Sequence, residues 1–115
     1  AGVMGVGSSI AYAASKGALN TLTLSLARAF APEIRVNAVC PGYVATPWFS
    51  GRFGEENSKR IADQTADGNP LKRVATAEDI ADTVMFLAGL ESRNISGEMI
   101  LVDSGMHLSM TGTKR

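Results

Sequence analysis

Cysteine and histidine are almost missing from this chain of 115 residues, which has one of each, Cys40 and His107. A single cysteine excludes an internal disulfide, and one cysteine with one histidine makes no cluster of metal ligands. We expect Cys40 to be a small buried side chain and His107 to be solvated. The low cysteine usage fits a reducing, cytoplasmic setting. The sequence also lacks an apolar run long enough to span a bilayer.

The net charge of the chain is zero, since eleven basic and eleven acidic residues cancel. This balance does not indicate a nucleic acid or a membrane surface as partner, so a small molecule is the expected ligand. With 45% hydrophobic residues, the chain suits one domain or part of one. It begins at Ala1, inside a glycine-rich loop, and we expect it to be the later part of a longer protein. The sequence does not decide whether a targeting signal precedes Ala1.

Tyr12 and Lys16 form the most informative pair in the sequence. In a helix, residues four apart share one face, so the ammonium of Lys16 can lie beside the hydroxyl of Tyr12. A nearby cation favours the tyrosinate, so Tyr12 could give or take a proton near neutral pH. The same spacing also occurs in ordinary surface helices, and only the surrounding sequence decides between the two interpretations.

A helical pattern surrounds this pair, from about residue 11 to residue 31, and ends at Pro32. The face that carries the pair continues as an apolar stripe, which we expect to lie against a sheet: Leu19, Leu26 and Phe30. A second face consists of small residues and fits either a subunit contact or packing within the chain: Ala11, Ala18, Ser25 and Ala29.

Two short apolar runs predict buried strands, over residues 34–40 and 99–102. A second helix is predicted to open at Thr76, with Asp79 at the capping-box position, and to end near Gly89. Alternation of helices and buried strands predicts an α/β fold with a parallel sheet.

Residues 43–69 are predicted to form a loop with a short polar helix. This stretch is too long for a simple connection, and long segments of this kind often form lids over ligands. Its aromatic side chains indicate either a partly apolar substrate pocket or rings that pack beneath the lid: Trp48, Phe49 and Phe53.

The opening glycines, Gly2, Gly5 and Gly7, look like a phosphate-binding loop in composition only. No strand precedes them, and their spacing is not that of a dinucleotide-binding motif. We interpret them as flexibility before the helix.

Taken in order, residues 12–16 (Tyr-Ala-Ala-Ser-Lys) and 35–46 (Arg-Val-Asn-Ala-Val-Cys-Pro-Gly-Tyr-Val-Ala-Thr) closely resemble the short-chain dehydrogenase/reductase family. Residues 70–73, 77–81 and 95–105 extend the resemblance over nearly the whole chain. It implies that residues 1–115 are the C-terminal half of a single NAD(P)-binding domain. That domain would have a Rossmann-type fold with a doubly wound parallel sheet, and residues 43–69 would be its substrate segment.

The resemblance also implies a reaction, the transfer of hydride between a nicotinamide cofactor, NAD or NADP, and a secondary alcohol or ketone. Tyr12 would be the general acid or base, and Lys16 would assist it and hold the nicotinamide ribose. Further cofactor contacts would come from Pro41, Gly42, Val44 and Thr46, although Thr46 could instead be a turn residue. Substrate contacts would come from Tyr43, Trp48 and Phe49.

Two parts of the family pattern are missing. The glycine-rich nucleotide motif and the catalytic serine would both precede Ala1, so we expect the 115-residue chain alone to be inactive. Among subgroups, the sequence is most similar to the 3-oxoacyl-[acyl-carrier-protein] reductase-like enzymes, and the family resemblance implies a homodimer or homotetramer at full length. The alternative is a non-catalytic relative that binds a nucleotide and regulates or scaffolds, which the intact Tyr12 and Lys16 argue against.

Overall fold

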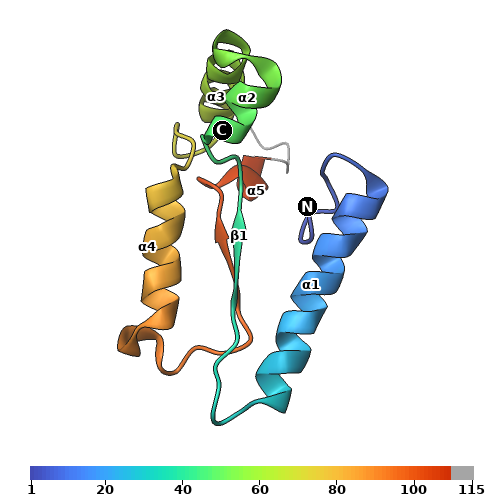
Figure 1. The fold of residues 1–115 in the computed structure, drawn as a ribbon, viewed down its shortest axis with the longest axis vertical. Helices are drawn as coiled ribbons and strands as arrows, with labels where there is room; N and C mark the ends of the chain where they lie inside the picture. Colours follow the sequence, from blue (N-terminus) through green and yellow to red (C-terminus); the bar gives the residue numbers. More distant parts are fainter. Residues whose placement is uncertain (110–115) are drawn as a thin grey trace. The chain divides into compact units, whose positions relative to one another are not determined.

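The computed structural model describes residues 1–109. The chain divides into two compact units, Ala1–Val39 with Phe86–Ile100 and Cys40–Met85 with Leu101–Arg115. In chain order, the elements in Figure 1 are α1 (Ile10–Ala29), β1 (Ala38–Pro41), α2 (Pro47–Phe53), α3 (Glu55–Gly68), α4 (Ala77–Ala88), the 3-10 helix η1 (Leu90–Ser92), β2 (Met99–Val102) and α5 (Met106–Ser109).

The strands β1 and β2 pair in a two-stranded sheet and run side by side in Figure 1. The backbone N–H of Ala38 donates to the carbonyl of Glu98, and that of Gly42 donates to the carbonyl of Val102. Because both partners advance in the same direction, the strands are parallel. The predicted α/β pattern with a parallel strand pair is therefore confirmed, and β2 has its predicted bounds.

The first strand is shorter than predicted, because residues 34–37 lie outside β1. Side-chain bonds there add to a backbone bond from the Gly97 N–H to the Val36 carbonyl, at 2.7 Å. The Asn37 amide donates to the carbonyl of Ile95 and accepts from the backbone N–H of Glu98. A β-branched run thus marks an extended segment, but its polar side chains decide which part of that segment is a strand.

Helix α1 agrees with the predicted helix to within two residues at each end. Its buried residues are Thr23 and Ala27, which lie on the same face as Tyr12. The expected covering of the apolar stripe is incomplete, since Leu19 is 49% exposed and Phe30 47% exposed in the described chain.

Most of the segment 43–69 is helical, so the predicted loop with one short helix is wrong. Pro47 occupies the first turn of α2, where its missing N–H costs nothing. Gly54, at φ +78°, separates the two helices, and Glu55 and Glu56 lie at the positive N-terminal end of α3. Helices α2 and α3 contact each other.

The predicted capping box at the start of α4 is confirmed. The Asp79 carboxylate accepts from the backbone N–H of Thr76 at 2.8 Å, and the backbone N–H of Asp79 donates to the Thr76 hydroxyl at 3.3 Å. Helix α4 ends at Ala88, directly before Gly89, as the sequence predicts.

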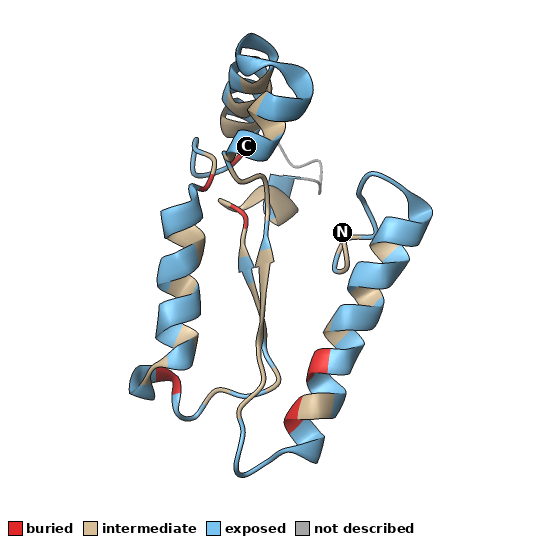
Figure 2. Ribbon diagram, viewed as in Figure 1, coloured by how far each residue is buried: buried red, intermediate tan, exposed pale blue. Residues whose placement is uncertain are grey.

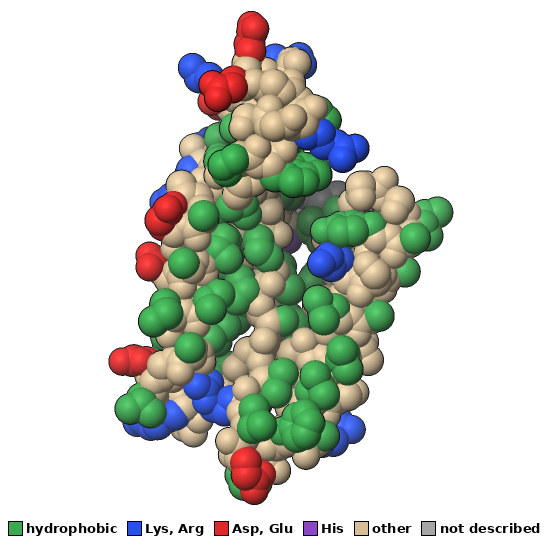
Figure 3. Space-filling model, viewed as in Figure 1, with side chains coloured by type: hydrophobic (Ala, Val, Ile, Leu, Met, Phe, Trp, Pro, Cys, Tyr) green, Lys and Arg blue, Asp and Glu red, His purple; other side chains and the backbone are tan. Residues whose placement is uncertain are grey.

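Few residues of the described chain are buried, as Figure 2 shows. The buried apolar residues among residues 1–109 are Ala27 and Ala75. Larger apolar side chains lie at the surface (Figure 3), for example Trp48 at 60% exposure and Met85 at 70%. Within residues 1–109, no helix combines the length and the apolar composition needed to cross a membrane.

Candidate active site

The predicted site residues divide between the two units. Tyr12 and Lys16 lie in the first unit, and the predicted residues from Pro41 to Phe49 lie in the second. Within the first unit, the Lys16 Nζ lies 5.4 Å from the centroid of the Tyr12 ring. The predicted pairing of these two side chains on one face of α1 is therefore present in the structure.

The backbone around Tyr12 is fixed by the start of α1. Ser9 caps the helix, because its hydroxyl accepts from the backbone N–H of Tyr12 at 3.1 Å. The Ser15 hydroxyl donates to the Tyr12 carbonyl at 2.7 Å. Tyr12 is 44% exposed in the described chain.

In the second unit, the end of β1 lies very close to the end of β2. A Cβ atom on Gly42 would lie 2.8 Å from both Cα and Cβ of Asp103, closer than real Cβ contacts allow. Only glycine therefore fits at position 42 without a shift of the backbone. Pro41 is the last residue of β1, next to this contact.

Val44 continues from this point as a parallel bridge to Ala75. In that bridge, the Ala75 N–H donates to the Tyr43 carbonyl and the Ala45 N–H donates to the Ala75 carbonyl. The bridge does not use the N–H and C=O of Val44 itself, which point to the opposite side of the strand.

Thr46 is the N-cap residue of α2, but its side chain makes no capping hydrogen bond. The Phe49 N–H donates to the Thr46 carbonyl instead, at 3.1 Å. A capping threonine normally accepts a hydrogen bond from a backbone N–H of its own helix, and the Thr46 hydroxyl does not make this bond.

The three predicted substrate residues lie together. The Tyr43 and Phe49 ring centroids are 4.4 Å apart, and those of Trp48 and Phe49 are 4.9 Å apart in an edge-on arrangement. Arg52 lies over the ring of Trp48, with Cζ at 5.4 Å from its centroid. Among the described residues, the Tyr43 hydroxyl is the buried side-chain oxygen that has no hydrogen-bond partner.

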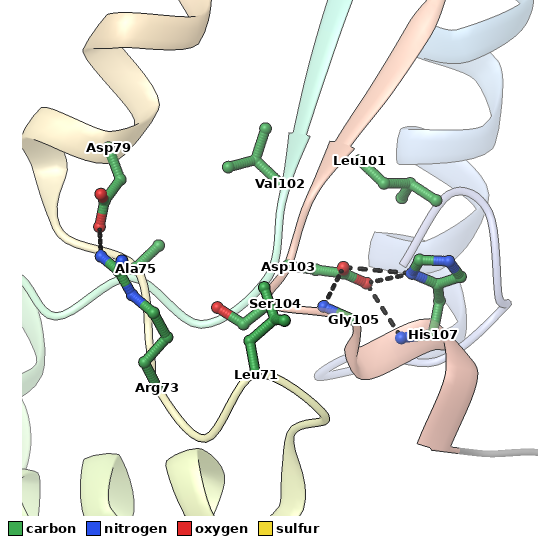
Figure 4. Close-up of a pocket in the computed structure, with 10 residues that line it drawn as sticks. All are labelled: Leu71, Arg73, Ala75, Asp79, Leu101, Val102, Asp103, Ser104, Gly105 and His107. Carbon is green, nitrogen blue, oxygen red and sulfur yellow. Dashed lines mark hydrogen bonds and ion pairs between the residues drawn. The ribbon is translucent and has the colours of Figure 1, made fainter.

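A cavity of about 380 Å³ lies in the second unit, and Figure 4 shows the residues that line it. They include Asp103, which lies against Gly42, and Ala75, the bridge partner of Val44. None of the predicted site residues is among them. Its charged groups are paired with one another: Arg73 contacts Asp79 at 2.6 Å, and His107 contacts Asp103 at 2.9 Å. With these charges already paired, the cavity offers little to recognise a ligand, and we do not assign it as the site.

The Asp103–His107 pair corrects one expectation, because His107 is not simply solvated. Burial alone would raise the pKa of Asp103. The hydrogen bonds that its carboxylate accepts from the His107 ring, from the His107 N–H and from the Gly105 N–H outweigh that effect and lower the pKa. The sequence signal for these bonds is the motif Asp103-Ser104-Gly105, because an aspartate in a turn often accepts from backbone N–H groups that follow it.

Asp103→Asn should therefore destabilise the full-length protein by about 1 to 2 kcal/mol near neutral pH. A carboxylate whose pKa is lowered by folding stabilises the protein above its ordinary pKa, about 4, and loses that effect as the pH falls through the lowered value. Urea unfolding of parent and variant between neutral pH and pH 3 tests this. The exposed Asp82→Asn is the matched control, and an equal loss of stability in both variants at every pH would contradict the assignment.

Arg35 has a role that the sequence did not reveal. Its guanidinium donates to three backbone carbonyls at the end of α4 and in the turn after it, those of Leu87, Gly89 and Ser92, and to a fourth at Ile95. Because these carbonyls include unsatisfied ends of α4, Arg35 acts as a structural cap.

Comparison with known proteins places these features in context. The family model described as enoyl-(acyl carrier protein) reductase matches residues 1–107. The short-chain dehydrogenase/reductase homolog YusR of Bacillus subtilis (strain 168) is 44% identical over 108 residues, covering 94% of this chain and 78% of YusR. The 2-(R)-hydroxypropyl-CoM dehydrogenase of Xanthobacter autotrophicus (strain ATCC BAA-1158 / Py2) is 40% identical over 94 residues, covering 81% of this chain and 36% of that enzyme.

Solved structures of dehydrogenases also align with this chain. The aldohexose dehydrogenase of Thermoplasma acidophilum aligns with a TM-score of 0.85 and 26% identity, covering 99% of this chain and 47% of that chain. A 4-hydroxyisoleucine dehydrogenase mutant in complex with NADH and succinate aligns with a TM-score of 0.77 and 28% identity, covering 99% and 44%. The chain thus spans less than half the length of most relatives it matches, and its strands and helices form part of a Rossmann-type fold.

Proposed function

Because this chain belongs to the short-chain dehydrogenase/reductase family, we propose that the full-length protein is an NAD- or NADP-dependent oxidoreductase that interconverts a secondary alcohol and a ketone. The observation that carries this proposal is the Tyr12–Lys16 pair, with its ammonium 5.4 Å from the phenol ring centroid. Relatives named as dehydrogenases, and one solved in complex with NADH, support the reaction class and the cofactor.

Tyr12 is the proton donor in this proposal. In the direction of reduction, its hydroxyl proton passes to the carbonyl oxygen as the carbonyl carbon gains a hydride, and the product is an alcohol. Lys16 supplies a positive charge beside the ring, which favours the tyrosinate that remains. When bound, a nicotinamide cofactor supplies or accepts the hydride.

The residues after β1 fit such a cofactor. The bridge to Ala75 does not use the backbone N–H and C=O of Val44. One donor and one acceptor side by side suit the carboxamide of a nicotinamide. The Thr46 hydroxyl is not spent on capping α2 and can bind the same molecule. Pro41, the exposed last residue of β1, and Gly42, which has no side chain, would lie beside the cofactor in this proposal.

The substrate would meet the aromatic cluster of Tyr43, Trp48 and Phe49. The exposed Trp48 ring offers apolar contact, while the buried Tyr43 hydroxyl is one unpaired polar group. The narrower proposal is a small carbonyl substrate of the kind that 3-oxoacyl-[acyl-carrier-protein] reductase-like enzymes use, in a cytoplasmic homodimer or homotetramer. The exposed small-residue face of α1 at Ala18 is available for such a subunit contact.

We expect Tyr43→Phe to raise KM for the substrate roughly two- to tenfold, the equivalent of one neutral hydrogen bond, and to leave kcat nearly unchanged. The variant should be no less stable than the parent, because it loses a buried hydroxyl without a partner. Steady-state kinetics and thermal unfolding of the full-length protein measure both. An unchanged KM with increased stability would remove Tyr43 from the substrate site.

The function itself is tested by titrating the full-length protein with NADH and NADPH and then adding a panel of ketones. The proposal predicts saturable nucleotide binding, with oxidation of the nucleotide by at least one ketone. Nucleotide binding without turnover on any ketone or alcohol would favour a non-catalytic binding protein. Absence of both would reject the proposal.

A further inference from the structure

Two of the opening glycines, Gly2 and Gly7, which the sequence suggested were only flexible, lie against the Tyr12–Lys16 pair. A Cβ atom on Gly7 would lie 3.0 Å from Cδ1 of Tyr12 and 3.5 Å from Cε1 of the same ring. Because 3.0 Å is at the limit of real carbon contacts, a side chain at position 7 fits beside the phenol ring only if the ring or the loop moves.

Gly2 makes the corresponding contact beside Lys16. A Cβ atom on Gly2 would lie 2.5 Å from the carbonyl carbon of Lys16 and 2.6 Å from its oxygen. These are backbone atoms of α1, which cannot yield as a side chain can. The absence of a side chain at position 2 therefore lets the loop lie on the turn of α1 that carries Lys16.

The loop between these contacts is closed and anchored. The Gly5 N–H donates to the Ala1 carbonyl at 2.8 Å, and a Cβ atom on Gly7 would also lie 3.2 Å from Cβ of Ala1. At the other end, Ser9 caps α1 through the backbone N–H of Tyr12. Gly5 itself is different, because a Cβ atom there would meet nothing within 4 Å.

We propose that Gly7 is a positioning residue for Tyr12, which leaves the phenol ring at its reacting place because it has no side chain, and that Gly2 allows the loop to reach that position. The proposal rests on the proposed role of Tyr12 in proton transfer. Tyr12 is 44% exposed, so its ring has room to shift away from a side chain at position 7. Small errors in the position of a reacting group reduce rates steeply, by as much as a hundredfold for about 1 Å.

The test compares Gly7→Ala with Gly5→Ala in the full-length protein. Both glycines have positive φ, +156° and +69°, so both variants carry backbone strain, but only alanine at position 7 meets the ring. We expect Gly7→Ala to lower kcat at least tenfold with the KM of the cofactor unchanged, and Gly5→Ala to stay within about threefold of the parent. Equal kcat values in two folded variants would overturn the proposal.

A double-variant cycle separates positioning from general damage. Once Tyr12→Phe has removed the proton donor, the position of the ring no longer matters, so adding Gly7→Ala should lower the residual kcat less than twofold. A further tenfold loss in that background would mean that Gly7 acts elsewhere. If Gly7→Ala does not fold, Ser9→Ala releases the loop without adding atoms, and an unchanged kcat in that variant would also contradict the proposal.

These outcomes are distinct from failure of the proposed function. Normal turnover in Tyr12→Phe alone would reject the role of Tyr12 as proton donor. Loss of turnover in Tyr12→Phe, together with equal activity of Gly7→Ala and Gly5→Ala, would reject only the positioning role of Gly7.

Discussion

Tyr12→Phe is expected to lower the kcat of the full-length protein by about a hundredfold or more. The substitution removes the one transferable proton and keeps the ring, so the contacts of that ring with Gly7 and with the Lys16 ammonium remain. Steady-state oxidation of NADH or NADPH by a ketone substrate measures the loss.

Cofactor affinity serves as the internal control for this variant. The dissociation constant of the nucleotide should change by no more than about tenfold, because the phenol oxygen contributes at most one hydrogen bond to binding. A variant that keeps near-normal turnover with every accepted substrate would show that another group supplies the proton. A variant that loses nucleotide binding as well would assign Tyr12 to binding rather than to proton transfer.

Arg35→Ala is expected to lower the free energy of unfolding by about 3 kcal/mol. Each terminal nitrogen of this guanidinium donates to at least two oxygens, at distances from 2.9 to 3.2 Å. These hydrogen bonds hold the end of α4 to the turn that follows it. Without the cation, the part-buried carbonyls there lose donors. The Ser92 hydroxyl, which also donates to Leu87 and Gly89, cannot replace several N–H groups in a fixed plane. Urea unfolding of the full-length protein gives the value.

Arg93→Ala is the matched control, since Arg93 is exposed and makes a single 3.3 Å bond to the carbonyl of Leu90. Its effect should stay within about 0.5 kcal/mol. Arg35→Lys should fall between the two, because lysine keeps the charge but cannot span the same set of oxygens. Equal stabilities of Arg35→Ala and Arg93→Ala would refute the capping role of Arg35.

Local patterns in the sequence predicted several elements well. The helix around Tyr12, the capping box of Thr76 and Asp79, and the strand at residues 99–102 all depend on interactions between neighbours in the chain. Such interactions depend on the spacing and type of nearby residues, so the sequence is sufficient to predict them. The juxtaposition of Tyr12 and Lys16 belongs to this class, as it follows from one helical turn.

Features that depend on contacts distant in sequence were missed. The bonds of Arg35 join residues more than fifty positions apart, and the contact of Gly42 with Asp103 spans a similar distance. The glycines before α1 were interpreted as flexible, because nothing in the sequence indicates that their missing side chains make room for Tyr12 and Lys16. The extent of the helices in residues 43–69 was underestimated for another reason. Few apolar residues mark them, and their signals lie at Pro47 and the glutamates after Gly54.

The central claim is that Tyr12 delivers a proton to a carbonyl that receives hydride from a nicotinamide cofactor. The most direct measurement supplies the full-length protein with NADH or NADPH deuterated at the hydride position and follows the label into the alcohol by mass spectrometry. The account predicts deuterium on the carbinol carbon of the product in the parent, and its formation at least a hundredfold slower in Tyr12→Phe. An alcohol product without deuterium on that carbon, or equal rates of labelling in the two proteins, would contradict it.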